Sequence, residues 1–140
     1  AGPDCPKLEA LRRTAGASRD AVYAGDFGAL GEAMVDNTEA QAQLHPELVG
    51  KDARTVIEIA RAHGALGWKV NGAGGDGGSV TLLTGPDSAA KRTLVREIEQ
   101  TDALYSSLPI YLSRTGLRLW DYATPTAGQG AIQEGTPARG

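Results

Sequence analysis

Residues 67–83 read GWKVNGAGGDGGSVTLL, and this stretch decides the fold that the sequence predicts. Leu66, Trp68 and Val70 alternate with glycine or polar residues, which is the period-two pattern of a half-buried strand. After the glycines, residues 79–84 are apolar and β-branched, which predicts a second strand. The stretch is therefore expected to form a β-hairpin with a glycine-rich connection.

The glycines of this connection can take positive φ angles and allow close backbone approach. Each costs roughly 0.5–1 kcal/mol relative to alanine in regular structure, so their density favours a functional loop over a stabilising one. A merely flexible hairpin loop is the alternative interpretation. We expect positive φ, or a position where a β-carbon would clash, at several of Gly72, Gly74, Gly75, Gly77 and Gly78.

Two common phosphate-binding motifs are excluded at this loop. Gly72, Gly74 and Gly77 match G-x-G-x-x-G, but that dinucleotide fingerprint requires a helix directly after the glycines. Here residues 79–83 predict a strand instead. The loop also lacks the Gly-Lys-Ser/Thr ending of a P-loop.

The stretch from Lys69 to Gly78, preceded by residues 63–67, resembles the third motif of the GHMP kinases. These enzymes phosphorylate galactose, homoserine, mevalonate and sugar phosphates. Residues 25–31 and Asn37 resemble the helices that precede this motif, and the resemblance spans residues 8–122. Asp76 interrupts a run that many members keep as Gly-Ala-Gly-Gly-Gly-Gly, which predicts a loop one residue longer.

The resemblance implies the C-terminal domain of such a kinase, because no stretch resembles the family's Pro-x-x-x-Gly-Leu-x-Ser-Ser nucleotide loop. The implied reaction is ATP- and Mg²⁺-dependent phosphoryl transfer to a hydroxyl, of a sugar or sugar phosphate. In the family the nucleotide loop and the acid–base residues belong to the N-terminal domain, so no catalytic residue is assigned and the chain alone is expected to be inactive. The residues implied to support the nucleotide site are Gly72, Ala73, Gly74, Gly75, Asp76, Gly77 and Gly78.

A helix over residues 27–44 carries the second candidate site. Asn37 and Gln41 lie in the middle of its apolar stripe, where an unpartnered buried amide costs about 1–3 kcal/mol. Either the amides satisfy a neighbouring loop, or they are exposed on a cleft and contact the phosphoryl acceptor, as the resemblance implies. The expected stripe consists of Leu30, Ala33, Met34, Asn37, Gln41 and Leu44.

Three further helices are predicted. One begins at Pro6, ends at Gly25 and has the inward stripe Leu8, Leu11, Ala15, Ser18 and Val22; Asp26 caps the helix that follows. Another is capped by Asp52, with the inward stripe Val56, Ile59, Ala60 and His63; the position of His63 at its C-terminus favours a dipole interaction over a catalytic base. The last follows the turn at 85–88 and has the inward stripe Ala90, Leu94, Val95 and Ile98.

Residues 109–112 and 117–120 predict a second hairpin around a turn at 113–116. The expected fold class is α+β, a ferredoxin-like antiparallel sheet covered on one face by helices and preceded by helices. We expect one domain over 4–122 and a flexible tail over 123–140, whose composition cannot offset ordering entropy.

Composition narrows the function classes. The chain has 140 residues, is 41% hydrophobic and has a net charge of −3 without a basic stripe, which argues against nucleic acid as a partner. No apolar run could span a membrane, and two distant histidines with the single Cys5 do not suggest a metal site. Without a secretory signal we expect a cytoplasmic protein. A stand-alone ferredoxin-like module that binds a small ligand or has a regulatory role remains the alternative to a kinase domain.

Overall fold

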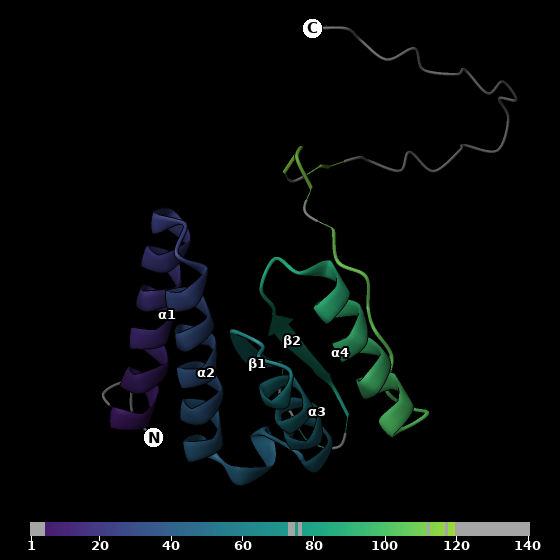
Figure 1. Ribbon diagram of the computed structural model, residues 1–140. Coiled ribbons are helices and arrows are strands. Elements are labelled where there is room, and N and C mark those ends of the chain that lie inside the picture. The colour runs from purple at the N-terminus through teal and green to yellow at the C-terminus, as the bar shows by residue number, and fades with distance from the viewer. Residues whose placement is uncertain (1–4, 73–74, 76, 112, 117, 120–140) are drawn as a thin grey trace, which may run out of the picture. The chain divides into compact units, whose positions relative to one another are not determined.

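The computed structural model describes residues 5–72, 75, 77–111, 113–116, 118 and 119. The elements, in chain order, are α1 (Pro6–Ala24), α2 (Phe27–Leu44), the short 3-10 helix η1 (Pro46–Leu48), α3 (Lys51–Ala62), β1 (Gly67–Asn71), β2 (Ser79–Leu83) and α4 (Ser88–Thr101) (Figure 1). The fold is α+β, as predicted. The described residues divide into two units between 108 and 109, and each unit is described by itself.

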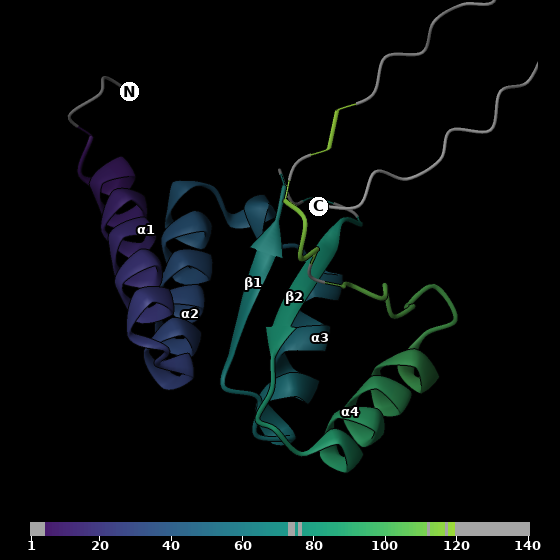
Figure 2. The same ribbon diagram turned by 90° about the horizontal axis from the view of Figure 1, so that it is seen from above.

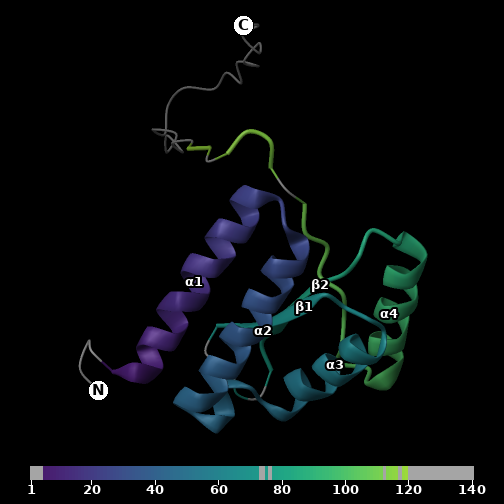
Figure 3. The same cartoon turned by 60° about the vertical axis from the view of Figure 1, so that its left-hand side comes forward.

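Helices α1 and α2 form an antiparallel helical hairpin (Figure 3). Gly25 ends α1 with φ 67°, and the N–H of Asp26 donates to the carbonyl of Ala21 at 3.0 Å. Asp26 then begins α2, since its Oδ1 accepts from the N–H of Ala29 at 2.9 Å. The predicted boundaries and the Asp26 cap are confirmed because each rests on local chemistry.

The predicted inward stripe of α1 is wrong in its second half. Thr14 and Ala21 are the buried residues, whereas Ala15 is exposed and Val22 is 62% exposed. The buried face is thus rotated by one residue from the counted stripe. A polar contact between Thr14 and Asn37 of α2 helps to set this rotation, which an apolar count cannot detect.

The predicted β1–β2 hairpin is confirmed. The strands pair antiparallel, with Trp68 opposite Leu82 and Val70 opposite Val80, so these four side chains share one face of the sheet. That face packs against α3, which Figure 2 shows behind the two strands. Its core cluster consists of Val49, Ile57, Trp68 and Val70, with Val80 and Leu82 packed against it.

Helix α2 approaches β1 so closely that neither backbone leaves room for a β-carbon. A β-carbon on Gly31 would lie 2.7 Å from the carbonyl carbon of Leu66, and one on Gly67 would lie 2.5 Å from the Cα of Gly31. Real β-carbons essentially never come this close to backbone atoms. The contact between helix and strand therefore requires glycine on both sides.

Thr38 forms hydrogen bonds with backbone groups on the outer edge of β1. Its buried hydroxyl lies 3.2 Å from the carbonyl oxygens of both Met34 and Trp68, and it accepts from the N–H of Val70 at 3.4 Å. An edge strand exposes such groups unless another element covers them. Helix α2 provides this cover, and Thr38 replaces the hydrogen bonds of a neighbouring strand.

The start of α3 differs from its prediction. Gly50 is the N-cap, without a side-chain cap bond, and Asp52 lies in the first turn instead of capping the helix. Ile57 and Ala60 are its buried residues, so Ile57 replaces the predicted Val56 and Ile59, which are half-buried.

Helix α4 starts as its turn predicts, with Asp87 Oδ1 accepting from the N–H of Ala89 at 2.7 Å. Leu94 is buried and Val95 and Ile98 are half-buried, whereas Ala90 is exposed. The predicted stripe is thus correct except at its first residue.

The predicted second hairpin is not formed by the described residues of 109–119, which contain no strand. A turn is present, in which the N–H of Thr115 donates to Ser113 Oγ at 3.3 Å and Gly116 has φ 63°. Ile110 and Leu119 are 76% and 88% exposed. Strand propensity depends on a surface to pack against, which these side chains lack. Leu112, Leu117, Trp120 and the predicted tail lie outside the described residues.

Two helical glycines give a matched test of the contact between α2 and β1. Gly16→Ala in α1 meets no atom within 4 Å and should stabilise the fold by about 0.5–1 kcal/mol through helix propensity. Gly31→Ala should instead destabilise it by about 1–3 kcal/mol, since the added methyl meets backbone. Chemical denaturation measures both. Equal stabilisation by the two substitutions would mean that α2 does not press against β1.

Candidate functional site

The glycine loop between β1 and β2 has the backbone conformation that its composition predicts. The φ angle is 74° at Gly72, 84° at Gly75, 105° at Gly77 and 102° at Gly78. Side chains disfavour these angles, so the expectation of several positive-φ glycines is confirmed. The other residues assigned to the loop, Ala73, Gly74 and Asp76, lie outside the described residues.

The loop is attached to the segment that leads into α3. The N–H of Gly75 donates to the carbonyl oxygen of Glu47 at 2.9 Å. A β-carbon on Gly50 would collide with the carbonyl oxygen of Gly75 and would lie 3.3 Å from its carbonyl carbon. We refer to residues 47–50 as the anchor segment.

The anchor segment is itself fixed by the core. Val49 is 3% exposed and packs with Ile57 of α3 and with Trp68 and Val70 of β1. The core thereby holds both the base of the hairpin and the segment against which its loop rests. A hydrophobic contact thus sets the position of the loop.

Polar side chains occupy the sheet face opposite the core. Asn71 Nδ2 donates across the strands to Ser79 Oγ at 3.2 Å and to Thr81 Oγ1 at 2.9 Å. Lys69 Nζ donates to the carbonyl of Val70 at 3.1 Å, and within the described part of the chain Lys69 forms no ion pair. The two Asn71 bonds stiffen the base of the glycine loop, because they link both strands directly below it.

Asn37 and Gln41 are not exposed, contrary to expectation. Both are half-buried, and Asn37 Nδ2 donates to Thr14 Oγ1 of α1 at 2.8 Å. Asn37 therefore faces the seam between α1 and α2. The expectation was wrong because the sequence does not show where α1 lies along α2.

Two buried oxygens in α2 have no hydrogen-bond partner among the described residues. They are Asn37 Oδ1 and Gln41 Oε1, one helical turn apart. An unpaired buried acceptor costs about 1–3 kcal/mol. A hydroxyl or water that donates to them would remove this cost.

A double-mutant cycle tests the seam. Thr14→Val and Asn37→Leu should each lower the free energy of unfolding by about 1 kcal/mol, because each leaves a polar partner behind. The double variant should lose less than the sum, since it removes both polar groups, with a coupling of about 1 kcal/mol. Urea denaturation of the four proteins gives the value. If no coupling is measured, Asn37 does not contact Thr14, and the predicted exposed position of Asn37 is correct.

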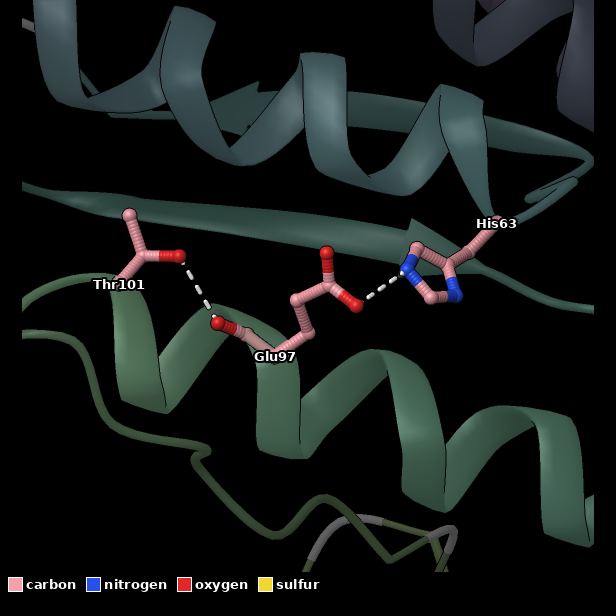
Figure 4. Close-up of polar contacts among 3 residues, drawn as sticks. All are labelled: His63, Glu97 and Thr101. Carbon is pink, nitrogen blue, oxygen red and sulfur yellow. Dashed lines mark hydrogen bonds and ion pairs between the residues drawn. The ribbon is translucent and has the colours of Figure 1, made fainter.

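The C-terminus of α3 carries a histidine–carboxylate pair that the sequence did not reveal. His63 is the C-cap, as its predicted position requires, and its Nε2 lies 2.8 Å from Glu97 Oε2 of α4 (Figure 4). Thr101 Oγ1 donates to the carbonyl of Glu97 at 2.8 Å. The sequence could not suggest the pair, because its two residues are 34 positions apart.

This pair is separate from the glycine loop. His63 lines a hollow of about 240 Å³ together with Thr84, Lys91 and Leu94. Helix α3 has 12 residues and rises by roughly 18 Å from the anchor segment to His63. That distance is too long for direct proton transfer between His63 and a group bound at the glycine loop. We therefore assign the pair to the packing of α3 against α4.

Tyr105 links the segment after α4 to the first turn of α3. Its hydroxyl donates to Asp52 Oδ1 at 3.1 Å. Burial, followed by this hydrogen bond and the negative charge of Asp52, raises the pKa of Tyr105 above its ordinary value. The resulting stabilisation is complete below the pKa of an unfolded tyrosine, about 10, and is lost as pH rises through the folded-state pKa.

The described residues hold no group of three or more His, Cys, Asp and Glu side chains that could bind a metal ion. No helix in the described part of the chain is long and apolar enough to cross a membrane.

Comparison with known proteins places this arrangement in a family. A family model described as GHMP kinases C terminal matches residues 18–107, which include the end of α1, all of α2, the anchor segment, the glycine loop and α4. Searches of curated proteins and of solved structures returned no match. Since the family model covers more than half of the chain, this protein belongs to the GHMP kinases and provides a C-terminal domain of that family.

Proposed function

We propose that this domain forms part of an ATP- and Mg²⁺-dependent kinase that phosphorylates a hydroxyl of a small molecule, a sugar or a sugar phosphate. The observation that carries the proposal is the glycine loop, which lies inside the range matched to the family and is attached to the anchor segment through Gly75. Phosphoryl transfer depends chiefly on positioning and electrostatic stabilisation, so a fixed loop suits it.

The role proposed for the loop is support of the nucleotide site. The N–H of Gly75 is already donated to Glu47 and is not free for a phosphate oxygen. The described residues hold no group of three or more His, Cys, Asp and Glu side chains that could bind a metal ion. As the family resemblance implies, we assign the phosphate-binding loop, the Mg²⁺ ligands and the acid–base residues to an N-terminal kinase domain that packs against this one, in the cytoplasm.

A titration and an assay test this assignment of roles to the two domains. The 140-residue chain should show no heat of binding with Mg-ATP in calorimetry, because it lacks the phosphate-binding loop. The same domain joined to an N-terminal GHMP kinase domain should phosphorylate members of a panel of sugars and sugar phosphates in an ATP-dependent assay.

Saturable ATP binding by the 140-residue chain at low micromolar concentration would contradict the proposal. It would favour the alternative, a stand-alone ferredoxin-like module that binds a small ligand or has a regulatory role. Inactivity of the joined protein toward the whole panel would remove the sugar assignment.

Asn37 and Gln41 remain the candidates for contact with the acceptor. The support is chemical: both amide oxygens are buried acceptors without partners among the described residues, and a sugar hydroxyl is a matching donor. Gln41 is the cleaner candidate, because Asn37 also donates to Thr14.

Gln41→Leu should lower kcat/KM for the acceptor by tenfold or more in the joined protein, since lost hydrogen bonds weaken transition-state binding. KM for ATP should stay unchanged. Exposed Gln43, whose backbone carbonyl rather than side chain contacts Lys7, gives the matched control Gln43→Leu. Equal effects of the two substitutions would exclude Gln41 from the acceptor site.

A further inference from the structure

Gly50 occupies a position where the backbone conformation does not require a glycine and where a residue with a capping side chain would stabilise the helix slightly more. Its φ of −65° and ψ of 172° are extended angles that any residue adopts. As the N-cap of α3 it leaves the helix without a side-chain cap bond. Ser, Asp or Asn would supply that bond and stabilise the helix.

The loop explains the glycine instead. A β-carbon at residue 50 would collide with the carbonyl oxygen of Gly75, and the atoms that block it are backbone. Backbone atoms cannot rotate aside as the end of a side chain does. Beside this contact, the N–H of Gly75 donates to the carbonyl oxygen of Glu47. Among the described residues, Gly75 thus rests on the anchor segment through a close contact with Gly50 and a hydrogen bond to Glu47.

We propose that Gly50 is a positioning residue for the glycine loop: its missing β-carbon lets Gly75 lie on the anchor segment and thereby sets where the loop presents its backbone to the nucleotide site. The importance of that placement for phosphoryl transfer rests on the proposed function. The docking of the loop does not.

An atom added at Gly50 should move the loop and leave the anchor in place. Val49 is buried in the core beside it, and the carbonyl of Gly50 accepts from the N–H of Arg54 at 3.1 Å. Gly72, Gly77 and Gly78 in the loop are exposed. Restoring van der Waals distance requires a displacement on the order of 1 Å. Misplacement of a catalytic constellation by that distance can cost about 100-fold in rate.

The test compares Gly50→Ser and Gly50→Ala with the control Gly85→Ala, whose added methyl meets no atom within 4 Å. In the 140-residue chain, NMR amide exchange at Gly75 should accelerate at least tenfold in both Gly50 variants. The melting temperature of Gly50→Ser should be unchanged or higher, because serine can cap α3. Joined to the N-terminal kinase domain, both variants should lose about 100-fold in kcat, with KM for the acceptor unchanged. Gly85→Ala should match the wild type in all three measurements.

Unchanged exchange at Gly75 in the Gly50 variants would overturn the inference, and so would accelerated exchange with full kcat. A loss of melting temperature in Gly50→Ser that accounts for the lost activity would overturn it in favour of a structural role. Failure of the proposed function is recognised separately: the wild-type joined protein would then be inactive, whereas accelerated exchange at Gly75 would still support the docking by Gly50.

Discussion

The close contact between α2 and β1 is the constraint on which the other contacts depend. With no β-carbon at Gly31 or Gly67, the helix lies directly against the edge strand, and the hydroxyl of Thr38 reaches the strand backbone. Because adjacent residues of a helix are about 100° apart, Thr38 on β1 turns Asn37 toward α1. One approach of backbone to backbone thus decides which polar side chain completes the sheet and which joins the helical hairpin.

Support for the glycine loop passes through a sequence of contacts. Val49 is fixed in the core, the anchor segment is fixed by Val49, and Gly75 rests on the anchor segment. From the other side, Asn71 links the two strands below the loop. Contacts with neighbouring segments therefore restrict the backbone at Gly75 and at the base of the loop.

The sequence predicts the elements well where local chemistry decides them. Gly25, Asp26 and Asp87 end or begin helices by capping, and the alternation around Trp68 predicts the strand. Rotation about a helix axis is harder to predict, because it depends on the partner. Thus the buried face of α1 includes Ala21 instead of the predicted Val22. The described residues of the predicted second hairpin form no strand, because their side chains lack a surface to pack against.

The backbone conformation of the glycine loop could be predicted from its composition. The contacts that hold the loop in place could not. Positive φ angles follow from a glycine-rich connection, whatever surrounds it. The contacts of Gly50 with Gly75 and of His63 with Glu97 join residues far apart in sequence, and no local pattern marks them. The same applies to Asn37, whose partner Thr14 belongs to another helix.

The contact between Gly50 and Gly75 also restricts how the sequence can diverge. A larger residue in a core is often tolerated after a second substitution removes volume nearby. No such second substitution exists here, because the obstructing oxygen belongs to the backbone and every residue at position 75 carries it. No substitution at position 75 can therefore compensate for a larger residue at position 50. A variant at position 50 can relieve the collision only if the loop moves.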